Sequence, residues 1–177
     1  QPLVRDMAAK SSARAVYFTL AEPLESWESC WFVRDGAIHC KRGPSVERVV
    51  DVDRVQLAYG GAVRFQLANV MAAMAAVEGL RPWLPVSRSS LASTLATFGR
   101  DPRDLPGRMQ LFRYEGAEVL VSSSKNPETY SQEIPLLQRL ARAHGYRRVI
   151  CVVSNVGNRD RAHFQAVSRA VAEFHGR

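Results

Sequence analysis

The sequence lacks any apolar run long enough to cross a membrane. Its most apolar stretch, Leu67–Val77, is much shorter than the roughly 18 residues that a membrane-spanning helix needs. The alanines in this stretch favour a buried helix instead. The first residues show no signal-peptide pattern, so the sequence predicts no association with a membrane.

Cysteine is scarce as well. The chain of 177 residues has 3 cysteines, Cys30, Cys40 and Cys151, too few for a disulfide framework. The spacing of Cys30 and Cys40 fits no usual zinc pattern, so we expect no metal site. Cys151 lies in an apolar stretch and is expected to be an inert core residue. Sparse, unpaired cysteine is typical of proteins of the reducing cytoplasm, where we expect this one.

Clustered charge is the third feature that the sequence lacks. The net charge is +7 and the isoelectric point about 9.8, but the arginines are scattered singly along most of the chain. No aromatic residues alternate with basic ones on a strand, so a nucleic-acid-binding module is disfavoured. The basic residues form either a solvated face or a site for an anionic ligand, and the composition leaves both open.

The first hundred residues show strand patterns followed by helix patterns. Asp35-Gly36 separates two short apolar runs and predicts a hairpin with a type I′ turn. Gly79 is placed to end the alanine-rich helix. The expected strands are Ala15–Leu20, Cys30–Arg34, Ala37–Cys40 and Val49–Val55, and the expected helices are Phe65–Glu78 and Ser87–Phe98.

A segment rich in proline and glycine, Asp101–Gly107, predicts a boundary between two domains, 1–100 and 101–177. A second hairpin is expected after it, with Glu115-Gly116 at its turn. The chain then alternates strand, helix, strand and helix, which predicts a parallel sheet with right-handed crossovers. The ranges are Val119–Ser122, Pro127–His144 (with a kink or a late start near Ser131, because of Pro135), Arg147–Ser154 and Arg161–Phe174.

Polar residues follow both of the predicted parallel strands. Ser122–Asn126 comes after the first strand and Asn155–Asp160 after the second. Ligands of open α/β sheets bind beyond the carboxyl ends of the strands, so these loops are the first candidates for a site. The alternative is local: Asn126 caps the helix that Pro127 opens.

The order of these motifs resembles the Mur ligase superfamily, across the end of its central domain and the start of its C-terminal domain. The resemblance is closest to the cyanophycin synthetase family. It rests on the helix motif Phe65-Gln66-Leu67-Ala68-Asn69-Val70, the hairpin Phe32–Gly36, the linker pair Gly107-Arg108 and the strand end that reads SSSKNP. It covers nearly the whole chain and implies an α/β fold, in which the end of an ATPase-type central domain precedes an incomplete, Rossmann-like, parallel-sheet C-terminal domain.

The resemblance implies an ATP-dependent carboxylate–amine ligase that acts through an acyl phosphate and joins an amino acid such as arginine to an aspartate side chain. ATP and Mg²⁺ are the implied cofactors, and the implied partners are the amino acid or peptide polymer and upstream domains of the same polypeptide. The chain starts at Gln1 and contains no Gly-rich loop with Gly-Lys-Ser/Thr. We therefore expect a piece of a longer protein that is inactive alone.

The resemblance implies functional positions at eight residues, and none of them is a confident catalytic residue. The ATP-binding candidates are Gln66, Asn69, Arg108 and Ser122, and the substrate-binding candidates are Lys125, Asn126, Arg159 and Asp160. Ser122 and Lys125 stand where the family has aspartate and histidine, and a serine lacks the charge-assisted hydrogen bond of a carboxylate. These departures leave an alternative open: a degenerate, non-catalytic lobe with an architectural, oligomerisation or polymer-binding role.

Overall fold

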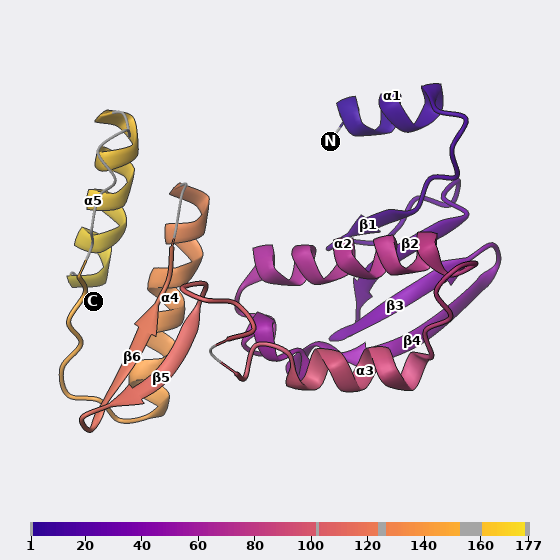
Figure 1. The fold of residues 1–177 in the computed structure, drawn as a ribbon. Coiled ribbons are helices and arrows are strands. Elements are labelled where there is room, and N and C mark those ends of the chain that lie inside the picture. The colour runs from indigo at the N-terminus through magenta and orange to yellow at the C-terminus, as the bar shows by residue number, and fades with distance from the viewer. Residues whose placement is uncertain (1, 102, 124–126, 153–160, 176–177) are drawn as a thin grey trace. The chain divides into compact units, whose positions relative to one another are not determined.

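The computed structural model describes residues 2–101, 103–123, 127–152 and 161–175 (Figure 1). They fall into two compact units, Gln1–Phe98 and Gly99–Arg177, which are described separately below. Both units combine helices with β-strands, so the predicted α/β class is confirmed in this general form. The assignment of the two parts to ligase domains stays a prediction.

The first unit is built on a mixed four-stranded sheet. The strands lie in the order β1-β2-β3-β4, and β1 runs parallel to β2 while the other neighbours are antiparallel. The parallel pair brings Tyr17 opposite Cys30. The bounds are β1 (Tyr17–Thr19), β2 (Ser29–Arg34), β3 (Ala37–Arg42) and β4 (Ser45–Asp51), and a helix α1 (Pro2–Lys10) precedes them.

The hairpin between β2 and β3 is confirmed. Asp35 and Gly36 have φ values of 48° and 68°, and a type I′ turn requires positive φ at both central positions. The next strand differs from the prediction because β4 starts at Ser45 and stops at Asp51. Asp51 pairs with Ala37, the first residue of β3, so the ladder has no further partner and the chain turns into two 3₁₀ helices, η1 (Val52–Arg54) and η2 (Gln56–Ala58).

Two helices, α2 (Arg64–Leu80) and α3 (Arg88–Thr97), complete the core of this unit. The end predicted at Gly79 is wrong, because Gly79 keeps a helical backbone and α2 continues to Leu80. The start of α3 matches the prediction, since the Ser87 hydroxyl accepts a hydrogen bond from the Ser90 amide at 3.1 Å. The buried cluster joins Trp31, Ile38, Cys40 and Val50 of the sheet, Val52, Val55 and Ala58 of the 3₁₀ segment, Leu67, Val70, Met71, Met74 and Ala75 of α2, and Leu95 of α3.

The second unit contains a hairpin and two helices. β5 (Gln110–Tyr114) pairs with β6 (Ala117–Val121), and Glu115 and Gly116 again have positive φ, as the sequence predicts. α4 (Pro127–Ala143) packs against α5 (Arg161–His175). α4 includes Pro135 and begins at Pro127, so the late start near Ser131 is wrong.

The predicted strand Arg147–Ser154 is absent from residues 147–152, the part of it that the structure describes. A strand needs a neighbour for its backbone hydrogen bonds, and among the described residues β6 pairs with β5 alone. Ile150 and Val152 are therefore exposed, and Cys151 is half-buried rather than a core residue. The parallel Rossmann-like sheet stays a prediction.

None of the helices in the described ranges is long and apolar enough to span a bilayer.

Candidate functional site

Gln66 and Asn69 lie together on the first two turns of α2. Residues three apart on a helix share a face, and here the Asn69 amide nitrogen donates to Gln66 Oε1 at 3.2 Å. Gln66 is 6% exposed and therefore buried, whereas Asn69 is exposed. The two predicted nucleotide-binding side chains therefore contact each other, and Asn69 is the one closer to solvent.

Arg108 and Ser122 lie at the same end of the β5–β6 hairpin. The Ser123 amide donates to the Gly107 carbonyl at 2.8 Å, which joins the linker to the end of β6. The Gly107 amide in turn donates to Gln110 Oε1 at 2.7 Å. Arg108 is exposed. This backbone bridge brings a cationic side chain and a hydroxyl to one place although they are far apart in sequence.

The Ser122 hydroxyl has a carboxylate beside it. It donates to Glu133 Oε1 at 2.5 Å, and Glu133 is 6% exposed although it belongs to a helix of the small second unit. A hydrogen bond to an ionised acceptor is shorter and stronger than a neutral one. α4 thus supplies an acidic side chain next to Ser122.

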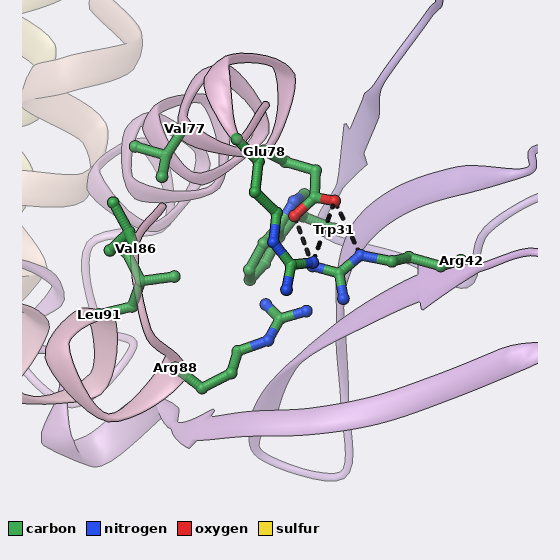
Figure 2. A pocket seen from close by; sticks show the side chains of 8 residues that line it. Trp31, Arg42, Val77, Glu78, Val86, Arg88 and Leu91 are labelled. Atoms are coloured by element: carbon green, nitrogen blue, oxygen red, sulfur yellow. Dashed lines mark hydrogen bonds and ion pairs between the residues drawn. The ribbon is translucent and has the colours of Figure 1, made fainter. Parts of the chain in front are cut away.

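A second cluster of charges lines a small pocket of the first unit (Figure 2). Arg42 on β3 binds Glu78 of α2 in a bidentate pair, with Nε···Oε1 at 2.8 Å and Nη2···Oε2 at 2.5 Å. Arg81 Nη1 approaches the same carboxylate at 3.9 Å. Burial alone would raise the pKa of Glu78, but the Arg42 guanidinium outweighs it and the pKa is lowered.

Among the described residues there is no group of three or more histidine, cysteine or acidic side chains that could hold a metal ion.

The comparisons with known proteins agree with the motif order. The cyanophycin synthetases of Trichormus variabilis (strain ATCC 29413 / PCC 7937) and Nostoc sp. (strain PCC 7120 / SAG 25.82 / UTEX 2576) are each 26% identical to the chain over 178 residues. This alignment covers 97% of the chain. The chain is thus similar to one part of a cyanophycin synthetase. It spans 19% of the length of these relatives, and no family model matches it.

The resemblance to cyanophycin synthetases that the sequence predicts is thereby confirmed, but the structure describes only part of the predicted site. Lys125, Asn126, Arg159 and Asp160 lie outside the described residues, so their roles stay predictions. Gln66 and Asn69 belong to the first unit, and Arg108 and Ser122 belong to the second. The structure therefore describes one pair of candidate residues in each unit.

Sequence reasoning missed Glu133 and the charges around Glu78. Glu133 lies eleven positions after Ser122, and only the folding of α4 onto the hairpin brings the two together. The sequence contains a weak indication for Glu78, because an acidic residue in a strongly apolar helix is expected to have a basic partner. Arg81 follows at the i+3 spacing. Arg42 could not be connected with it without the fold.

Proposed function

We propose that this cyanophycin-synthetase-like module is part of an ATP-dependent ligase that forms an amide bond between a carboxylate and an amine. The observation that carries the proposal is the similarity to cyanophycin synthetases over 97% of the chain. We further propose that the amine belongs to an amino acid such as arginine and the carboxylate to an aspartate side chain of a polymer. Upstream domains of a longer polypeptide and a cytoplasmic location belong to the same proposal.

The residues present fit a partial nucleotide site. Arg108 is exposed on the segment that the Gly107–Ser123 bridge holds in place, and a guanidinium suits a phosphate or a carboxylate. Asn69 offers an amide at the surface of α2. ATP with Mg²⁺ supplies the phosphoryl group that activates the carboxylate, and the chain itself has no Gly-rich loop for the phosphates.

Arg108 would act by holding negative charge in place. An arginine that binds an oxyanion in a bidentate manner fixes both its position and its orientation, which lowers the barrier to the reaction of that group. The hydrogen-bonded pair of Ser122 and Glu133 lies at the same end of the hairpin, next to the backbone bridge between Ser123 and Gly107.

The test is ATP turnover by the polypeptide encoded by the complete reading frame that contains this sequence. Turnover is measured with and without arginine and a poly-aspartate primer. We expect arginine-dependent turnover that falls roughly 10- to 100-fold in Arg108→Ala, the loss expected for one charged hydrogen-bonding group. Arg103→Ala is the matched control, because Arg103 is exposed in the same segment and forms its ion pair with its near neighbour Asp101.

ATP turnover that does not depend on arginine, or equal turnover in both variants, would contradict the proposed role of Arg108.

One observation favours a second candidate function, a non-catalytic lobe that binds the polymer: the Ser122 hydroxyl already forms a hydrogen bond with Glu133 inside the unit. Poly-aspartate binding without any ATP turnover would support that candidate.

A further inference from the structure

Three guanidinium groups surround the pocket drawn in Figure 2, and they meet there from different elements. Arg42 comes from β3, Arg81 follows α2, and Arg88 is the first residue of α3. Two carboxylates form ion pairs with them. Glu78 pairs with Arg42 and Arg81, and Glu47 pairs with Arg88, whose Nε lies 3.2 Å from Glu47 Oε2. The cluster therefore keeps a surplus of one positive charge.

The donors of Arg88 are the unusual feature of this cluster. Both Nη1 and Nη2 are buried, and neither has an oxygen or nitrogen acceptor among the described residues; the Cys40 thiol beside the guanidinium is a weak acceptor. The guanidinium carbon lies 5.1 Å from the centre of the Trp31 ring, which holds the group by a cation–π contact. Figure 2 shows the guanidinium pointing into the space between Arg42 and Leu91.

Trp31 adds another donor without a partner. It is 1% exposed and lines the same pocket, and its indole Nε1 is buried without an acceptor in the described part of the chain. Buried donors in native proteins are almost always satisfied, because leaving one unpaired is costly. Two side chains that face one pocket with unsatisfied donors thus call for an acceptor that occupies it.

We propose that this pocket binds a carboxylate group, with one oxygen in the cavity between Arg88 and Trp31. The charge supports a monoanion, because one negative charge neutralises the surplus and a phosphate dianion would exceed it. The geometry supports an oxyanion, since a single carboxylate oxygen can accept hydrogen bonds from both Nη atoms of one arginine. The cavity itself is about 10 Å³, room for an oxygen atom or one water and too small for a whole phosphate group.

This inference does not depend on the proposed ligase function. The pocket includes none of the residues proposed to bind the nucleotide, and it lies within the first unit. The ligand that it predicts is a small carboxylic acid or the acidic side chain of a peptide.

The test is an NMR titration of the full chain that follows the indole Nε1–H resonance of Trp31, assigned by its loss in Trp31→Phe. Acetate and N-acetyl-aspartate amide are the two carboxylate probes, and chloride and phosphate are the comparison anions, all at constant ionic strength. We expect a saturable shift with a millimolar midpoint for at least one carboxylate. A response to acetate alone points to a small acid, and a response to both points to an acidic side chain.

Arg88→Gln should weaken this binding at least tenfold, and Arg88→Lys should also weaken it, because lysine keeps the charge but lacks the planar pair of donors. Arg34→Gln is the matched control: Arg34 also lies over an aromatic ring, 4.9 Å from the centre of Phe32, and binds a glutamate, Glu22. It should bind like the wild type.

The proposal is overturned if the wild type shows no saturable shift, if chloride gives the same shift, or if phosphate binds more tightly than acetate. An unchanged titration in a folded Arg88→Gln protein overturns it as well. If the wild type shows no saturable shift, a single water satisfies the donors of Arg88 and Trp31. The wild-type titrations decide the question even where a variant fails to fold.

Discussion

Gly61 takes a backbone conformation that side chains rarely accept. Its φ is +81°, and a Cβ atom built on it would lie 2.6 Å from Cγ1 of Val52. Val52 is itself buried in the core of the first unit, so it has little room to move. Gly61 therefore lets the chain turn from η2 towards α2 while it stays close to the core.

We predict that Gly61→Ala lowers the free energy of unfolding by about 2–4 kcal/mol, from left-handed strain together with the clash against Val52. Gly60→Ala is the control: Gly60 has a φ of +64° but open space around its Cβ position, so only strain of about 1 kcal/mol is expected. Urea denaturation of the three proteins measures the difference. Equal losses in both variants would show that the approach to Val52 is unimportant.

At the scale of single residues, sequence patterns located candidates but not contacts. The predicted helix contains both Gln66 and Asn69, and in the structure they share a face because the i, i+3 spacing is fixed by helix geometry. Nothing in the sequence connected Ser122 with Glu133, or Arg88 with Trp31. Those contacts depend on how separate elements pack, which residue spacing does not encode.

At the scale of secondary-structure elements, α2 contacts the sheet through an ion pair as well as through apolar packing. Glu78 is 7% exposed near the end of the helix and binds Arg42 of β3 with both carboxylate oxygens. Because the pair lowers the pKa of Glu78, folding favours its ionised form. The stabilisation is present above the ordinary glutamate pKa of 4.5 and is lost as the pH falls through the lower pKa of the folded state.

Glu78→Gln should accordingly lower the free energy of unfolding by about 1–3 kcal/mol at pH 7, because it leaves Arg42 without its charged partner. The difference from the wild type should shrink as the pH falls below 4.5. Glu22→Gln is the control, since Glu22 pairs with Arg34 at the surface, where its side chain is 61% exposed. Urea denaturation curves, measured at intervals of about one pH unit between about pH 3 and pH 7, test this pH dependence. A constant difference across that range would contradict the assigned role of the pair.

Element prediction succeeded where the signal is local. Asp35-Gly36 and Glu115-Gly116 both form the tight turns that their chemistry favours, and Ser87 caps α3. It failed for residues 147–152, which are apolar enough for a strand but have no neighbouring strand in the described part of the chain. A strand is defined by its partner, whereas a helix or a turn is satisfied by its own residues.

At the scale of the whole molecule, the chain divides after Phe98, close to the boundary that the prolines of Asp101–Gly107 predict. The two units differ in the amount of core. The buried cluster of the first unit runs from Trp31 to Leu95, so every member belongs to that unit. In the second unit the described buried apolar residues are Met109, Ile134, Leu136 and Val167.

The scattered arginines show why composition alone did not reveal the pocket. Arg42, Arg81 and Arg88 look isolated along the sequence, yet a sheet and two helices bring them around Glu78 and Trp31. The clustering of charge is a property of the folded unit, and the sequence carries it only through the packing that the apolar residues direct.

This difference in core content predicts that the first unit folds alone. A fragment of residues 1–98 contains the whole cluster, and α3 contributes Leu95 to it and places Leu91 against it. We expect a cooperative thermal transition and amide NMR resonances that overlay those of the full chain, because a single domain with its own core folds as one unit. A fragment of residues 1–86, which lacks α3, is the matched control and should lose about 2–5 kcal/mol of stability from exposing the surface that Leu95 covers. Poorly dispersed resonances for residues 1–98 would mean that the first unit needs residues beyond Phe98 to hold its structure, and equal stability of the two fragments would mean that α3 adds nothing to the core.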